Sequence, residues 1–320
     1  MPYATFNNLT EQLIQFFQNQ KYAEALELIT VEAPNFPGDR MWADYWKMVS
    51  AARLENRELV YQVAHQMLAD GLWYGEILWR QSPSFAPLLG DPQFEQIVSD
   101  SLAAQLRDMP AGEPLVLTKF PTDHSASSPL LIALHGNQST AERTLPFWAS
   151  AVSDGWVLAI PQSDQVMFKD AYAWDDLEKA RAFVTSQYEA LAKNTLFDSQ
   201  KVIIAGHSMG GLVAIRIALE GLLPISGFVV NGPAVPYLDE PEELEKLLPA
   251  ARQRGLRAYF IVGEQDDAIN APEVKSLAEK MQTAGIPCEL ELVPNSTHDY
   301  DAAYSAALRR GLAFVSMNDS

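Results

Sequence analysis

A serine set among glycines is the residue with the clearest chemical potential in this 320-residue chain. It lies in Gly206-His207-Ser208-Met209-Gly210, which fits the pattern G-x-S-x-G. The run Val202–Ala205 before it is typical of a buried strand, and Gly211–Leu219 after it has a helical pattern. Such a strand–turn–helix exposes a serine hydroxyl on a strained turn, and its glycines let strand and helix pack closely. The pattern therefore predicts that Ser208 is a nucleophile.

A serine hydroxyl is a weak nucleophile near neutral pH, so it needs a general base that a carboxylate orients. In strand–turn–helix motifs of this type the base follows the serine in the chain. His298 is the only histidine after Ser208 and is therefore the predicted base. Its loop follows the strand-like run Cys288–Val293. We expect His298 Nε2 to lie about 2.6–3.2 Å from Ser208 Oγ, or somewhat further without ligand.

The orienting carboxylate is expected on the loop after the strand-like run Tyr259–Val262. Glu264, Asp266 and Asp267 all qualify there by their chemistry. The position after the preceding strand-like run, Gly227–Val230, holds Asn231, which cannot supply a carboxylate. The residues alone leave the choice among the three acids open.

The second part of the chain alternates short apolar runs with amphipathic helical patterns. Strands buried on both faces read as continuous Val, Ile and Leu runs, and helices connect them in a parallel sheet. The pattern predicts an α/β fold with a doubly wound, mainly parallel sheet. Because loops at the carboxyl ends of such strands form the pocket, we expect Trp174 and Phe168 to line it. The predicted strands are Leu130–Leu134, Trp156–Ile160, Val202–Ala205, Gly227–Val230, Ala258–Val262 and Cys288–Val293.

The first part of the chain has only helical patterns, from Leu9 to about Leu106. We therefore expect a helical domain over residues 1–110 and a catalytic domain over residues 111–320. The segment Asn19–Leu26 is followed 36–37 residues later by a degenerate counterpart, which resembles a tetratricopeptide repeat with its period of about 34 residues. A generic helical bundle or hairpin array is the alternative. This region could cover the pocket or bind a peptide or protein partner.

Residues 115–318 resemble an α/β-hydrolase fold serine hydrolase. They are most similar to the phospholipase/carboxylesterase and dienelactone-hydrolase-like branch. Beside the Ser208 motif and the terminal His298, the resemblance rests on Leu134-His135-Gly136-Asn137 and on Gly263-x-x-Asp266. Dienelactone hydrolases use a cysteine nucleophile, so their substrate is not carried over to a chain that has Ser208.

The resemblance implies roles for the residues around the nucleophile. It selects Asp266 as the acid through the G-x-x-D spacing, with Asp267 as the runner-up. The backbone N–H of Asn137 would form an oxyanion hole together with that of Met209 at the helix N-terminus. The two histidines within these motifs, His135 and His207, would then be structural.

Composition narrows the class of partner. The 23 Lys and Arg against 41 Asp and Glu give a net charge of −18, which argues against nucleic acid or an anionic membrane as partner. The single cysteine, Cys288, allows neither an intramolecular disulfide nor a cysteine-based zinc site. No run of 18 apolar residues predicts a membrane span, and the N-terminus lacks the pattern of a signal peptide, which favours a cytoplasmic location.

These features favour hydrolysis of small-molecule carboxylic esters, thioesters included, through a Ser-His-Asp triad and an acyl-enzyme, without cofactor or metal. A nucleotide-binding domain is disfavoured because no G-x-G-x-x-G follows the first strand. One alternative is a serine peptidase of the prolyl-oligopeptidase type, although such enzymes usually carry a β-propeller. Another is a helical-repeat interaction protein with a vestigial hydrolase domain, against which the complete triad argues.

Overall fold

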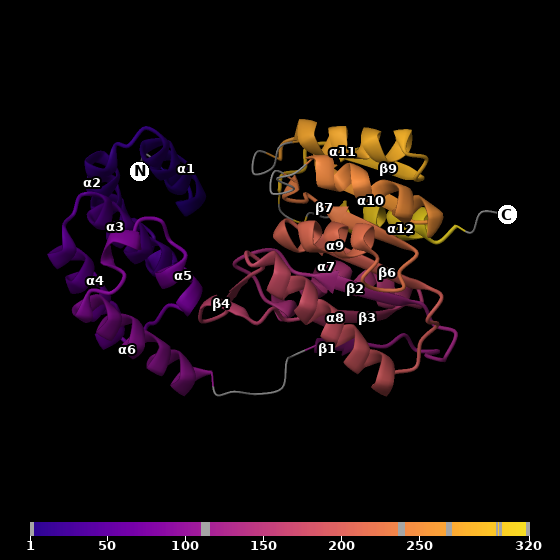
Figure 1. The fold of residues 1–320 in the computed structure, drawn as a ribbon, viewed down its shortest axis with the longest axis horizontal. Helices are drawn as coiled ribbons and strands as arrows, with labels where there is room; N and C mark the ends of the chain where they lie inside the picture. Colours follow the sequence, from indigo (N-terminus) through magenta and orange to yellow (C-terminus); the bar gives the residue numbers. More distant parts are fainter. Residues whose placement is uncertain are drawn as a thin grey trace. The chain divides into compact units, whose positions relative to one another are not determined.

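The chain forms two compact units. The computed structural model describes residues 3–109, 116–235, 241–266, 271–298, 300 and 303–317. Unit 1 consists of Met1–Gly112 together with the short segment Val166–Lys169, and unit 2 consists of Glu113–Gln165 and Asp170–Ser320 (Figure 1). None of the helices in the described residues is both long and apolar enough to cross a membrane.

Apart from the segment Val166–Lys169, unit 1 is helical, as its sequence pattern predicts. Polar side chains start three of its helices by accepting backbone N–H groups at the first turn: Thr5, Asn56 and Asp91. The helical region is confirmed, whereas its likeness to tetratricopeptide repeats stays a prediction. Its α-helices are α1 (Phe6–Gln18), α2 (Tyr22–Glu32), α3 (Arg40–Arg53), α4 (Arg57–Ala69), α5 (Glu76–Arg80) and α6 (Pro92–Asp108).

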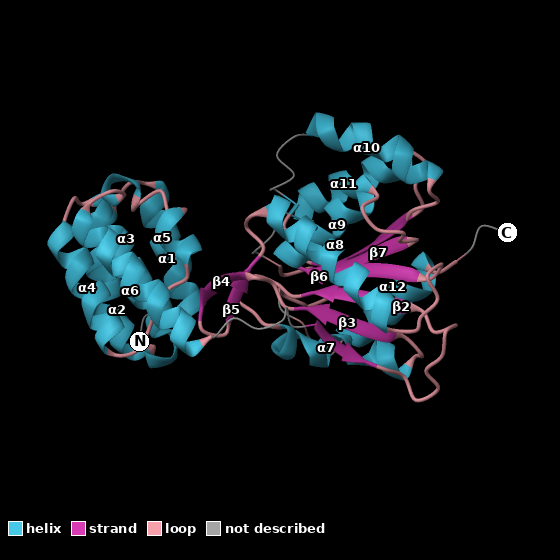
Figure 2. Ribbon diagram, turned by 60° about the horizontal axis from the view of Figure 1, so that its bottom comes forward, coloured by secondary structure: helices cyan, strands magenta, loops and turns pink. Residues whose placement is uncertain are grey.

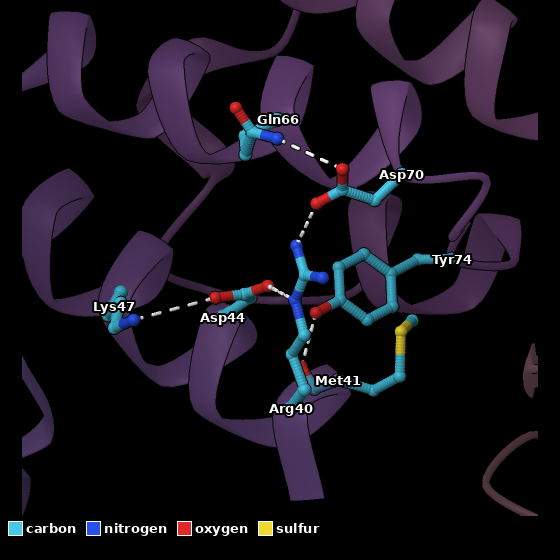
Figure 3. A network of polar contacts seen from close by, with 7 residues as sticks. All are labelled: Arg40, Met41, Asp44, Lys47, Gln66, Asp70 and Tyr74. Atoms are coloured by element: carbon cyan, nitrogen blue, oxygen red, sulfur yellow. Dashed lines mark hydrogen bonds and ion pairs between the residues drawn. The ribbon is translucent and has the colours of Figure 1, made fainter. Parts of the chain in front are cut away.

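A polar network ties the start of α3 to the end of α4 (Figure 3). The Arg40 guanidinium donates to Asp44 at 3.3 Å and also to Asp70, which accepts a further bond from Gln66. Beside this network the Tyr74 hydroxyl donates to a backbone carbonyl of α3. Because Arg40 is partly exposed, we expect the network to orient the helices more than to stabilise them.

Unit 2 is built on a seven-stranded sheet with the order β1-β3-β2-β6-β7-β8-β9. The strand β1 pairs antiparallel with β3, and all other neighbours pair in parallel. The predicted doubly wound, mainly parallel sheet is thereby confirmed (Figure 2). The strands are β1 (Val116–Lys119), β2 (Leu130–Leu134), β3 (Val157–Pro161), β6 (Val202–His207), β7 (Gly227–Asn231), β8 (Arg257–Gly263) and β9 (Cys288–Val293). A separate hairpin pairs β4 (Gln165–Phe168) with β5 (Ala171–Ala173).

Helices cover both faces of this sheet. Alternate side chains of β2 enter different cores: Ile132 joins the core under α8, α9, α10 and α11, whereas Leu131 joins the core under α7 and α12. Successive side chains of a strand point to opposite faces of the sheet, and both faces are covered here. This explains why each central strand is apolar throughout. The helices are α7 (Ala141–Ser153), α8 (Leu177–Asn194), α9 (Met209–Glu220), α10 (Pro241–Gln253), α11 (Ala271–Thr283) and α12 (Tyr304–Val315).

Two glycines let α9 lie directly against β6 and β2. A Cβ on Gly206 would lie 2.3 Å from the carbonyl oxygen of Gly210. A Cβ on Gly210 would lie 2.2 Å from the carbonyl oxygen of His135. Both obstacles are backbone atoms, which cannot swing away as a side chain can. The glycines of the serine motif are therefore required by the close approach of three backbones.

Replacing Gly210 by alanine should accordingly lower the free energy of unfolding by about 3 kcal/mol, because the new methyl group overlaps the His135 carbonyl. Gly38→Ala is the matched control, since a Cβ on Gly38 would have no neighbour within 4 Å. Urea unfolding of both variants measures the difference. Equal stability of the two variants would contradict the packing described here.

Candidate active site

The strained turn at Ser208 joins β6 to α9. Its φ of 53° and ψ of −122° are unusual for a residue with a side chain. Two backbone hydrogen bonds hold the turn, because Ser208 N–H donates to the Asn231 carbonyl at 3.1 Å and the Ser208 carbonyl accepts from Ala234 at 3.1 Å. The structure thus has the strand–turn–helix that the glycine pattern predicts.

The loops after β8 and β9 bring Asp266 and His298 together. His298 Nδ1 lies 3.0 Å from Asp266 Oδ2. The Asp266 side chain is only 1% exposed, whereas that of His298 is 21% exposed. A proton on Nδ1 that is donated to the carboxylate leaves Nε2 as a proton acceptor. A Cβ on Gly232 would lie 3.0 Å from both contacting atoms, so this glycine makes room for the pair.

The structure describes two of the three acids that the sequence offers as partners of His298. Asp266 makes the contact with His298, Glu264 is not bonded to it, and Asp267 lies outside the described residues. Within the described part of the chain, no hydrogen bond joins Ser208 Oγ to His298. Hydrogen bonds between a nucleophile and its base are often long before substrate binds.

The buried imidazole of His207 contacts the rings of both His298 and Tyr300. The His207 ring centroid lies 4.7 Å from that of His298 and 4.6 Å from that of Tyr300. Its Nδ1 lies 3.1 Å from the Asn231 carbonyl oxygen. Burial, followed by the proximity of His298, lowers the pKa of His207 to about 3, so its ring is neutral near pH 7. The expectation of a structural role agrees with these contacts, whereas the sequence carried no signal for Tyr300.

Two backbone N–H groups are available near the nucleophile. Met209 begins α9, and Asn137 follows β2. Among the described residues, neither of these two backbone N–H groups donates to a protein acceptor. The Asn137 side chain is fixed instead, because its Oδ1 accepts from Trp174 N at 2.8 Å and its Nδ2 donates to Asp175 at 2.6 Å. No sequence motif indicates the part played by Asp175.

The imidazole of His135 supports the same loop from inside the protein. Its Nδ1 lies 2.8 Å from the Gly136 carbonyl oxygen, and its Nε2 accepts from Ser163 N at 3.2 Å. Burial lowers the pKa of His135 to about 4, so the ring stays neutral near pH 7. Trp174 Nε1 donates to the His135 carbonyl at 2.7 Å. His135 thus shapes the loop, as its motif implies.

Of the two residues expected to line the pocket, Trp174 lies in a core instead, whereas the expectation for Phe168 stays a prediction. Trp174 is 0% exposed and packs in the core beside His135 and Phe183, so it cannot form the wall of an open pocket. The physical reason is its indole N–H, which has an acceptor inside the protein. Phe168 belongs to unit 1, where its ring contacts Trp42. Among the described residues, no group of three or more His, Cys, Asp or Glu could hold a metal ion.

Comparison with known proteins agrees with this architecture. A model of the dienelactone hydrolase family matches residues 160–313, slightly less than half of the chain. An uncharacterised protein from Bacillus cereus is 24% identical, with a TM-score of 0.55 over 98% of this chain and 99% of its own. Esterase PE8 is 17% identical, with a TM-score of 0.51 over 62% of this chain and 99% of its own. No curated protein matches the chain.

Unit 2 has the α/β-hydrolase fold. The family match supports a hydrolase of the esterase kind. The likeness to the Bacillus cereus protein extends over nearly the whole chain, so the helical region belongs to the shared fold as well.

The two buried histidines predict a stability that falls in acid. Both have folded-state pKa values below the usual 6.5, so below pH 6.5 the unfolded chain takes up protons that the folded chain refuses. As the pH falls from about 6.5 to 4, each histidine should therefore lower the free energy of unfolding by on the order of 3 kcal/mol. Above pH 6.5 neither histidine changes it. Urea unfolding across this range should show a shallower loss for His207→Asn than for wild type. Identical slopes would contradict a neutral, buried His207.

Proposed function

We propose that this protein is a serine hydrolase that cleaves small carboxylic esters, thioesters included, through an acyl-enzyme on Ser208. The observation that carries the proposal is the 3.0 Å contact between His298 Nδ1 and the buried Asp266, on the same sheet edge as the strained Ser208. The match to the dienelactone hydrolase family supports the same reaction class.

In the first half of the reaction, Ser208 Oγ attacks the carbonyl carbon of the ester while its proton passes to His298 Nε2. Asp266 stabilises the imidazolium that forms, because its carboxylate already accepts from Nδ1. The negative charge that develops on the carbonyl oxygen is received by the backbone N–H groups of Met209 and Asn137.

Collapse of this tetrahedral intermediate breaks the bond to the leaving alcohol or thiol, which takes the proton from His298. Ser208 is then esterified by the acyl group. In the second half, a water molecule gives a proton to His298 and attacks the acyl carbon. As the resulting tetrahedral intermediate breaks its bond to Ser208 Oγ, His298 gives that proton to Oγ, and the carboxylic acid leaves.

Residues 111–320 would carry this chemistry in the cytoplasm. The helical residues 1–110 would cover the pocket or bind a protein partner. A peptidase of the prolyl-oligopeptidase type and a vestigial hydrolase remain the competing functions. Esters of graded acyl length, assayed beside proline-containing peptides, distinguish them. Peptide cleavage favours the first competitor, and an inert Ser208 favours the second.

Ser208→Ala should lower the hydrolysis of p-nitrophenyl esters by roughly 10⁴-fold or more, because no other group can form the acyl-enzyme. Steady-state kinetics measure the loss. Ser186→Ala is the control, since that hydroxyl donates within α8 to the Phe183 carbonyl. Activity that survives in the Ser208 variant would rule out the proposed mechanism.

Asp266→Asn should lower kcat by roughly 10⁴-fold with little change in KM, because the amide no longer stabilises the imidazolium. Glu264→Gln and Asp267→Asn should stay within about threefold of wild type. Steady-state kinetics of the three variants assign the acid. A large loss in either control, with an active Asp266 variant, would move the acid to another residue.

A further inference from the structure

The loop that carries His298 is tied to the loop after β8 shortly before it reaches this residue. Gln265 N–H donates to the Ser296 carbonyl at 2.8 Å, one residue before Asp266 and two residues before His298. A Cβ on Gly263 would lie 2.4 Å from the same carbonyl oxygen, so the two backbones meet closely here. Together with the contact between Asp266 Oδ2 and His298 Nδ1, this bond fixes one side of the imidazole.

A hydrogen bond at Nδ1 alone leaves the imidazole of His298 free to turn about the line that joins the two bonded atoms. Proton transfer requires Nε2 to face Ser208 Oγ, so this rotation has to be restrained as well. The His207 ring lies beside the imidazole, with centroids 4.7 Å apart and an interplanar angle of 39°. His207 is itself held at Nδ1, which lies 3.1 Å from the Asn231 carbonyl oxygen. It therefore offers a fixed surface on which the base can rest.

Tyr300 follows His298 by two residues and anchors the other side of the loop in a core. Its ring is stacked on that of Phe147 in α7, with centroids 4.1 Å apart and an interplanar angle of 9°. The rings of Trp148 and Tyr304 meet it edge-on, at 6.0 and 4.7 Å. Edge-on aromatic pairs stabilise a fold beyond the area that they bury. The side chain that follows the base is thus fixed by α7 and α12.

The same tyrosine ring reaches the histidine on which the base rests. The centroids of Tyr300 and His207 lie 4.6 Å apart, so His207 contacts two residues of the His298 loop. Burial raises the pKa of Tyr300 and lowers that of His207 to about 3, so both rings are uncharged near pH 7. Neither ring therefore carries a charge that would draw His298 away from Asp266.

We propose that Tyr300 is a positioning residue for the base: its ring, packed on Phe147 and against His207, fixes the tilt of the His298 imidazole. The inference rests on the proposed ester hydrolysis, in which His298 takes the proton of Ser208. Tyr300 acts through His207 and through the loop that it shares with His298, and it is not a reacting group. Because a misplacement of about 1 Å can cost roughly 100-fold in rate, this restraint should be visible in kcat.

The kinetic test uses two replacements of the same residue. Tyr300→Leu removes the ring, and Tyr300→Phe keeps the ring without the hydroxyl. We expect Tyr300→Leu to lose roughly 30- to 100-fold in kcat on a p-nitrophenyl ester with KM within about threefold, and Tyr300→Phe to stay within about threefold of wild type. Tyr188→Leu is the matched control, because this half-buried tyrosine of α8 packs on Phe197 at 6.2 Å in the same unit. It should keep wild-type kinetics.

The proton on His298 Nδ1 gives a readout that does not depend on activity. NMR of protein with isotope-labelled histidine detects this proton, and His298→Gln assigns its signal. Its exchange with water should rise about tenfold in Tyr300→Leu, but not in Tyr300→Phe or Tyr188→Leu, because a less restrained ring leaves Asp266 more often. Phe147→Leu removes the stacked partner and should give the same rise, which supplies a second variant if Tyr300→Leu does not fold. Unchanged exchange in either folded variant overturns the inference.

The outcomes separate the two proposals. Ester hydrolysis that Ser208→Ala abolishes, with kcat unchanged in Tyr300→Leu, overturns the positioning role and leaves the hydrolase standing. A wild type that hydrolyses no ester overturns the proposed function, and the exchange measurement then decides the positioning role alone. A lower thermal stability of Tyr300→Leu with normal kcat would mark the ring as packing only and would also overturn the inference. So would a Tyr300→Phe variant that loses as much as Tyr300→Leu.

Discussion

A carboxylate that is almost completely buried needs a partner, because an isolated charge in the protein interior costs several kcal/mol or more. For Asp266 that partner includes His298, at 3.0 Å. The two lie on loops after neighbouring parallel strands, β8 and β9, so the sheet register brings them together. The glycine at position 232 leaves the space that the pair occupies. This hydrogen bond holds His298 at the edge of the sheet that also carries Ser208.

Backbone packing sets the position of the nucleophile in the same way. Close contact among β2, β6 and α9 is possible only because Gly206 and Gly210 have no side chain. That contact places Ser208 on a strained turn and directs the N-terminus of α9 toward the edge where substrate would react. The neutral rings of His135 and His207 complete the support, since charge on either would be costly where they lie. The geometry is thus built from glycines and uncharged histidines as much as from Ser208, His298 and Asp266.

Local patterns predicted the sheet and the motif residues, but not the contacts between distant segments. The strands were evident because burial on both faces leaves continuous apolar runs, and Ser208 and His298 followed from motif and chain order. The prediction for Trp174 is wrong because an aromatic residue on a loop near strand ends gives the same sequence pattern whether it lines a pocket or packs in a core. No local pattern indicates Tyr300, because its contact with His207 joins segments that are far apart in the sequence.

The central claim is that Ser208 forms a covalent acyl-enzyme, and intact-protein and peptide mass spectrometry test it most directly. The protein is mixed with a p-nitrophenyl ester in excess, quenched in acid within the first turnover and digested. We predict one added acyl group per chain, on the peptide that contains Ser208, with release of one equivalent of nitrophenolate in the burst. Turnover without an adduct, or an adduct on another residue, would contradict the claim.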